Sequence, residues 1–322
     1  VVVVIVAAVI LGFYLRSAAP KFALVWVFGL LLGFILQRGR FCFASAFRDL
    51  FLLRDGRVMK GILAGLAVAT FGFALVMFTY SPSLNHLPSA ANIFPVGWHT
   101  VAAGVIFGVG MVVAGGCVSG NLYRSGEGYV TSWIAILGIM LGLSFVSATW
   151  NWWYGISMKN APLVWLPQKL GWTGGVGLTL LALLGIFLLV QWWESRGGRV
   201  YPRPADRPEV VGFGGNMKEL GRTLFRRPLP VVAAGSVLGL LNVFVYLYTR
   251  PLGVTGELWR GANTAAQKLG VNYGALQGLD SGGGCSPTAE GGSGVLSWGL
   301  MINGGLIAGA LGAPPPLHPV SQ

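Results

Sequence analysis

The sequence predicts an all-α polytopic membrane protein with about eight transmembrane helices and short re-entrant helices. Of its 322 residues, 54% are hydrophobic and only 10% are charged, a composition too apolar for an ordinary soluble domain. Many of its 50 glycines lie inside apolar runs, where small residues let helices approach closely or break. The runs long enough to span a bilayer, or nearly so, are 1–15, 22–37, 60–80, 98–115, 130–150, 171–193, 229–249 and 294–312.

The segments between these runs have distinct characters. The first run begins at Val1 without an initiator methionine, so we expect the first span to be incomplete. Between the second and third runs, residues 41–53 are amphipathic and too short to span, which predicts a re-entrant or interfacial helix. The fourth run ends in the pair Gly115-Gly116, which permits a sharp backbone turn.

Two basic stretches determine the predicted orientation. Residues 38–60 and 196–227 hold 14 of the 22 Lys and Arg residues, and basic loops face the cytoplasm. When the first stretch is placed inside and the sides alternate, the second also falls inside, whereas 81–97 and 151–170 fall outside. The external segments agree in composition, because 81–97 has no Lys or Arg and 151–170 carries a belt of Trp and Tyr.

A proline-rich basic linker, 196–228, divides the chain into a first half, 1–195, and a second half, 229–322. The motif from Gly29 to Gly33 in the first half resembles that from Gly235 to Gly239 in the second. In the predicted topology the two copies are inverted, an arrangement in which substrate sites form between the repeats near the membrane midplane. A chance likeness is the alternative, because this glycine spacing is common in membrane helices.

The composition excludes several kinds of site. The net charge of +12 lies in loops between spans without interleaved stacking aromatics, so we expect contact with lipid headgroups and not with nucleic acid. Three cysteines without a CxxC motif do not predict a disulfide framework. The histidines are too scattered to form a zinc or haem site, so we expect no metal and no cofactor. They are His86, His99 and His318.

Cys42 lies in the amphipathic segment beside basic residues, among them Arg38 and Arg40. Guanidinium groups close to this thiol would stabilise its thiolate and attract anions. The alternative is that Cys42 is a small buried hydrophobe in a helix anchored by interfacial arginines.

The segment 115–120, which reads Gly-Gly-Cys-Val-Ser-Gly, places a thiol at the end of an apolar run. Gly115 and Gly116 allow turns that leave backbone N–H groups pointing at a ligand, and such a nest binds anions. Gly120 keeps the following segment permissive. Because a Gly-Gly-Cys corner at the end of a span contributes little to packing, Cys117 is the leading candidate for a substrate pathway, with Cys42 as its partner.

Two charged residues and a third cysteine complete the set of candidates. Arg124 and Glu127 are three residues apart and can pair with each other. Alternatively, Glu127 stabilises the N-terminus of the next span through the interaction of its negative charge with the helix dipole. Cys285 lies in a Gly- and Ser-rich segment predicted to be external, and it is either a gate or a bystander.

Reduced thiols and backbone amides with little fixed charge favour a soft, sulfur-bearing anion as ligand. A thiol can donate a weak S–H hydrogen bond to a terminal sulfur while amides hold the oxygens. A hard phosphate would require Lys, Arg or a metal, and no phosphate-loop motif occurs. Passage also requires weak binding at successive sites, because one tight site would trap the ion.

The motifs around Cys42 (38–49) and Cys117 (115–128) resemble the YeeE/YedE sulfur-transport family. The likeness covers about residues 20–150 and, more loosely, 250–256. It implies thiosulfate uptake across a bacterial cytoplasmic (inner) membrane by inverted repeats whose short re-entrant helices meet near the centre. It also implies that thiosulfate moves along a row of cysteines, two of which are Cys42 and Cys117.

The chain departs from the family pattern in its second half. The resemblance predicts a further Gly-Cys corner after the span that follows Cys285, yet the sequence ends shortly after Gly312-Ala313. We therefore expect a C-terminally incomplete chain in which Cys285 need not be the second-half pathway cysteine.

The leading interpretation is a transporter and not an enzyme. No nucleotide-binding motif is present, so the energy for uptake would come from gradients or from consumption of the substrate inside the cell. One alternative is a membrane sulfurtransferase in which a Cys117 persulfide passes sulfur to a small TusA-type carrier in the cytoplasm. Another is a transporter of selenium compounds, because selenium chemistry would use the same soft ligands.

Overall fold

The computed structural model describes residues 2–18, 20–80, 94–196, 231–248, 252–271, 273, 276–279 and 297–313. In these residues the chain is helical, which confirms the predicted all-α class. The helices are α1 (Val2–Ala18), α2 (Pro20–Gly39), α3 (Phe43–Leu52), α4 (Arg57–Tyr80), α5 (Trp98–Val113), α6 (Val118–Gly126), α7 (Val130–Trp153), the π-helix η1 (Tyr154–Met158), α8 (Leu166–Ser195), α10 (Val231–Tyr248), α11 (Val254–Lys268) and α12 (Trp298–Gly312).

Six helical stretches in the described part of the chain are long and apolar enough to cross a membrane, so the fold is polytopic as predicted. They are Pro20–Leu52, Arg57–Thr79, Trp98–Gly126, Val130–Met158, Leu166–Ser195 and Val231–Tyr248. Helix α12 is apolar but shorter. Most of the segment between the predicted spans 98–115 and 130–150 forms helix α6, which the apolar pattern does not reveal because the helix is short and polar.

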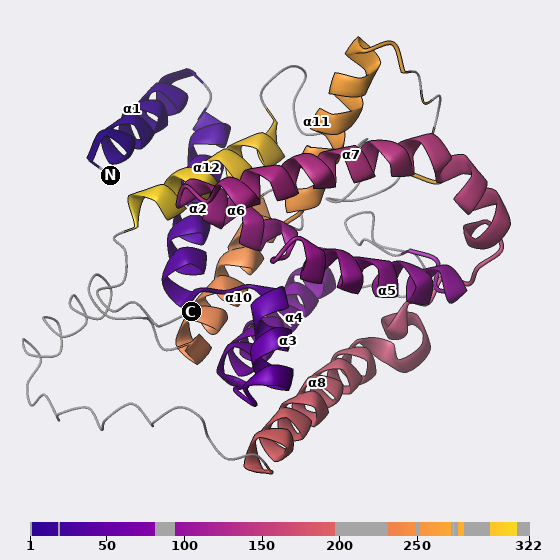
Figure 1. The fold of residues 1–322 in the computed structure, drawn as a ribbon. Coiled ribbons are helices and arrows are strands. Elements are labelled where there is room, and N and C mark those ends of the chain that lie inside the picture. The colour runs from indigo at the N-terminus through magenta and orange to yellow at the C-terminus, as the bar shows by residue number, and fades with distance from the viewer. Residues whose placement is uncertain are drawn as a thin grey trace, which may run out of the picture.

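Helices α2, α4, α10 and α12 form the centre of the protein through two close pairings, α2 with α12 and α4 with α10 (Figure 1). Glycines bring the backbones of each pair into contact. A Cβ atom on Gly29 of α2 would lie 2.7 Å from the carbonyl oxygen of Ile302 in α12. One on Gly65 of α4 would lie 2.6 Å from the carbonyl oxygen of Gly235 in α10. Larger residues at these positions would force the helices apart.

Each of the two pairings joins a helix from the first half of the sequence to a helix from the second half. Helix α2 carries the first of the predicted glycine copies and packs on α12, while α10 carries the second copy and packs on α4. The partner faces are also alike, because 61–65 of α4 reads Gly-Ile-Leu-Ala-Gly and 305–309 of α12 reads Gly-Leu-Ile-Ala-Gly. This second likeness was not predicted, because only the motifs 29–33 and 235–239 were compared.

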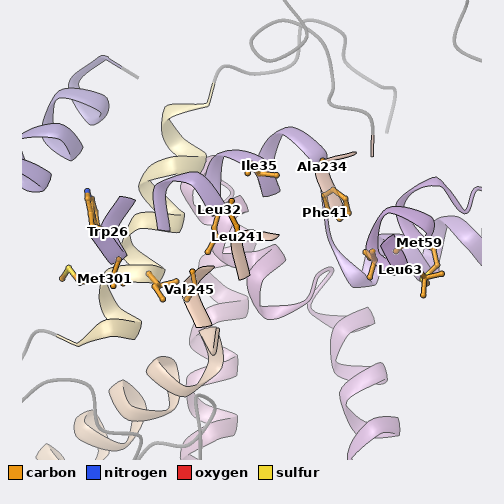
Figure 2. Close-up of a cluster of buried hydrophobic side chains, with 14 of the residues drawn as sticks. Trp26, Leu32, Ile35, Phe41, Met59, Leu63, Ala234, Leu241, Val245 and Met301 are labelled. Carbon is orange, nitrogen blue, oxygen red and sulfur yellow. The ribbon is translucent and has the colours of Figure 1, made fainter. Parts of the chain in front are cut away.

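A cluster of buried apolar side chains fills the space between these four helices (Figure 2). Leu32 of α2, Val245 of α10 and Met301 of α12 belong to it. The cluster also includes Phe41, which immediately precedes α3. The residue next to Cys42 is therefore anchored in the core.

The other end of α3 is held by α8. Trp193 Nε1 donates to the carbonyl oxygen of Leu50 at 3.2 Å, and Glu194 accepts the backbone N–H of Gly56 at 2.6 Å. Glu194 also forms an ion pair with Lys60 at the start of α4. These contacts fix the turn between α3 and α4, so both ends of α3 are attached to the rest of the protein.

We predict that Gly29→Ala and Gly65→Ala each lower the stability of the detergent-solubilised protein by about 1–3 kcal/mol, because the added methyl group meets a backbone oxygen that cannot rotate away. Thermal unfolding followed by tryptophan fluorescence measures the effect. Gly108→Ala in α5 is the matched control, since no atom lies within 4 Å of its added methyl group. Equal melting temperatures for all three variants would contradict the proposed backbone contacts.

Candidate functional site

The turn between α5 and α6 is shaped by glycine and fixed by side chains of α6. Gly115 has φ of +65°, a conformation that side chains other than glycine rarely adopt. Its carbonyl oxygen accepts a hydrogen bond from Arg124 Nη1 at 2.8 Å. Asn121 Nδ2 donates to the carbonyl oxygens of Gly116 at 3.1 Å and Cys117 at 3.3 Å. The predicted Gly-Gly-Cys corner is therefore a defined turn folded back onto the helix that follows it.

Helix α6 begins at Val118, with Cys117 as its N-cap. Cys117 Sγ accepts the backbone N–H of Gly120 at 3.3 Å and lies 3.5 Å from Ser119 Oγ. The helix is short and polar, yet most of its residues are buried against α12, α7 and α2. The first backbone N–H groups of a buried helix have no partner within the helix, so they need acceptors from elsewhere in the protein or from a ligand.

Helix α3 presents the second thiol. Cys42 is its N-cap, and Cys42 Sγ lies 3.7 Å from Cys117 Sγ, within the range of an S–H···S hydrogen bond. The backbone N–H of Cys117 donates to Cys42 Sγ at 3.5 Å. The two helices thus point their N-terminal ends at one pair of sulfur atoms.

Gly120 leaves the space that the sulfurs occupy. A Cβ atom there would lie 2.7 Å from Cys42 Sγ and 3.2 Å from Cys117 Sγ. Both thiols are free and buried, with Cys42 2% and Cys117 8% exposed. The absence of a side chain at Gly120 is therefore what allows the two thiols to meet.

The predicted supporting charges lie around the ends of α2 and α6. Arg38 is buried, whereas Arg40 is exposed in a left-handed conformation with φ of +48°. Arg124 donates to the turn, and its guanidinium group also interacts electrostatically with the Glu127 carboxyl three residues later. Partial burial raises the pKa of the Glu127 carboxyl above its ordinary value, and a hydrogen bond from Gln37 opposes that shift.

Residues 38–313 match the Sulphur transport family. The chain belongs to this family. The match includes both thiols and every other predicted site residue, and it confirms the resemblance seen in the sequence.

Named relatives of this family member are transporters. Probable transporter YedE of Salmonella typhimurium is 34% identical over 177 residues, which cover 55% of this chain and 42% of the relative. Thiosulfate transporter TsuA of Spirochaeta thermophila is 37% identical over 163 residues, covering 49% and 46%. Thiosulfate transporter TsuA of Escherichia coli is 42% identical over 118 residues, covering 35% and 30%. In each comparison the chain spans less than half the length of the relative.

The structure brings together most of the site residues that were predicted from the sequence. Cys42, Cys117 and Gly120 are in contact, and the turn at Gly115 and Gly116 carries Cys117. Cys285 lies outside the described residues. Asn121 was missed, although its place four residues after a cysteine at a helix start is typical of a side chain that reaches back to the turn.

The arrangement suits a small anion that accepts hydrogen bonds. Two helix N-termini carry partial positive charge, and the thiols add weak S–H donors. In the described part of the chain, no three His, Cys, Asp or Glu side chains gather as metal ligands. The groups that contact the two thiols are backbone amides and the Ser119 hydroxyl.

We predict that Asn121→Ala lowers the stability of the solubilised protein by about 1–3 kcal/mol, because it leaves the buried carbonyl oxygen of Gly116 without its donor. Asn121→Asp keeps the shape but replaces the donating amide by an acceptor, so it should be at least as damaging. Thr264→Ala, which removes an exposed hydroxyl, is the control. Thermal unfolding compares the three variants, and an unchanged Asn121→Asp would show that the turn does not depend on this bond.

Proposed function

We propose that this chain moves thiosulfate, or a closely related sulfur oxyanion, across the bacterial cytoplasmic membrane into the cell. The observation that carries the proposal is the pair of sulfurs, 3.7 Å apart, between the N-terminal ends of α3 and α6. The thiosulfate transporters among the relatives support this choice of substrate.

The donors at the site fit the two ends of thiosulfate. Its terminal sulfur is soft and accepts S–H hydrogen bonds from thiols, while its oxygens accept N–H bonds from backbone amides. The partial positive charge of each helix end attracts a dianion without a fixed cation that would hold it. Binding of this kind is weak enough for release, which passage requires.

We infer that the anion passes from one thiol to the next. Cys117 and Cys42 are two successive donors, and Cys285 is a third candidate in the sequence. Gly115 and Gly116 form the turn that places Cys117, and Gly120 leaves room for both sulfurs because it has no side chain. Arg124, Arg38 and Arg40, with Glu127, supply charges that guide the anion at one end of this route.

We also propose that the protein consists of two inverted repeats, 1–195 and 229–322, joined by the basic segment 196–228 on the cytoplasmic side. The exchange of glycine-lined partners between α2–α12 and α4–α10 supports the repeat. The distribution of Lys and Arg supports the orientation. In such folds the substrate site lies between the repeats.

A sulfurtransferase is the second candidate, and the contact between the two thiols favours it. A persulfide on Cys117 would have a neighbouring thiol to receive or release sulfur, and a TusA-type carrier would then collect it at the basic cytoplasmic segments. The names of the relatives favour transport of the intact anion.

We predict that uptake by cells without other thiosulfate importers delivers the sulfane and sulfonate sulfurs in equal amounts when each is labelled separately. A sulfurtransferase would deliver mainly the sulfane label. Unequal delivery would therefore replace the transport proposal by its alternative.

We expect Cys117→Ala and Gly120→Ala each to lower this uptake by about tenfold or more. The first removes a buried hydrogen-bond donor and the second displaces the two sulfurs, and a loss of about 1.4 kcal/mol in either variant corresponds to a factor of ten. Gly108→Ala is the matched control for Gly120→Ala, since its methyl group meets no neighbour. Membrane levels of each variant are measured by immunoblot. Full uptake by Cys117→Ala at normal levels would exclude both candidate functions.

A further inference from the structure

We propose that Cys42 and Cys117 form a reversible disulfide when tetrathionate, the polythionate in which two thiosulfate units are joined through an S–S bond, enters the site. The thiol pair is then a modification site that stops transport under oxidising conditions. The inference rests on the proposed function in one respect, because the anion pathway is what admits the oxidant to two buried thiols.

The two sulfurs are close enough to bond after a small movement. A disulfide has an S–S length of about 2.0 Å, so the present 3.7 Å separation must shorten by about 1.7 Å. Both cysteines are N-caps with extended backbone, outside the rigid part of their helices. Cys117 also follows the Gly115-Gly116 turn, whose backbone adjusts readily. No side chain separates the sulfurs, because they are in direct contact and Gly120 beside them has no side chain.

Burial restricts which oxidants reach the pair. Cys42 is 2% and Cys117 8% exposed, so a bulky peptide disulfide has no access to either thiol. A polythionate carries the same sulfonate groups as thiosulfate and would be drawn in by the same backbone amides. The site therefore selects an oxidant that resembles its substrate.

The reaction balances in two steps. Cys117, the more exposed thiol, loses its proton, and its sulfur attacks an inner sulfur of tetrathionate. A bond forms between Cys117 Sγ and that inner sulfur, which gives the adduct Cys117 Sγ–S–SO₃⁻, while the central S–S bond of tetrathionate breaks and thiosulfate leaves. Cys42 then loses its proton and attacks Cys117 Sγ, which forms the disulfide and releases a second thiosulfate. Two thiols are oxidised by two electrons, one polythionate is reduced to two thiosulfates, and two protons are released.

A backbone N–H group faces each of the attacking sulfurs. Exchange requires a sulfur-centred negative charge, and helix N-termini stabilise such a charge. The backbone N–H of Cys117 points at Cys42 Sγ and that of Gly120 at Cys117 Sγ. Thiosulfate, the leaving group in each step, is the anion that the same amides are proposed to bind.

The disulfide would block the route in a direct way. Joining the sulfurs removes both S–H donors and ties the start of α3 to the start of α6. Reduction by a dithiol restores the donors and the separation. Uptake should therefore stop in tetrathionate and resume after reduction.

The test uses the purified full chain carrying Cys285→Ala, in which Cys42 and Cys117 are the remaining cysteines. After exposure to tetrathionate, intact-mass measurement should show the loss of two hydrogens and no retained adduct. The additional change Cys42→Ser should instead leave a stable S–SO₃ adduct on Cys117. Oxidised glutathione should modify neither protein. If Cys285→Ala does not fold, peptide mapping of the unaltered chain shows directly whether a peptide containing Cys42 is joined to one containing Cys117.

Uptake into proteoliposomes separates this inference from the proposed function. Thiosulfate uptake by the unaltered chain that falls at least tenfold with tetrathionate and recovers with dithiothreitol, together with the mapped disulfide, supports both. Uptake without any Cys42–Cys117 disulfide overturns the inference and leaves the proposed function intact. A disulfide in a protein that takes up no thiosulfate supports the inference and overturns the proposed function. Absence of both overturns both.

Discussion

The N-terminal ends of α3 and α6 face each other across two sulfur atoms that are in contact. Each helix end carries a partial positive charge, and these two charges repel. The surrounding structure holds them together against this repulsion. Phe41 anchors the start of α3 in the core, Trp193 and Glu194 hold its far end, and α12 supports α6. An anion between the two ends would turn the repulsion into attraction, so the site favours anions before any side-chain charge is considered.

The neutral character of the donors distinguishes this site from one built to retain its ligand. Guanidinium groups lie at the end of α2 and on α6, but the groups bonded to the sulfurs are backbone amides, the Ser119 hydroxyl and the thiols themselves. Charged donors would bind a dianion more tightly and release it more slowly. Neutral donors at helix ends combine attraction with rapid release, which suits passage better than storage.

The sequence predicted the features that depend on composition and local pattern. Apolar runs located the spans, and Gly115-Gly116 marked the turn that carries Cys117. It could not show that Cys42 lies against Cys117, because the residues are 75 positions apart and their contact depends on how α2, α6 and α12 pack. Helix α6 and the role of Asn121 escaped for a related reason: a short polar segment resembles a loop until its burial is known. The likeness between 61–65 and 305–309 was present in the sequence but gains meaning only from the glycine contacts.

The exchange of partners between α2–α12 and α4–α10 has a consequence for how the chain assembles. Helices α2 and α4 are synthesised before α10 and α12, yet the backbone surfaces that fit their glycines belong to those two later helices. Each early helix is stable in lipid by its own backbone hydrogen bonds, so it can wait without its partner. The four central helices can pack together, and α6 can pack on α12, only after the last of these helices has been inserted.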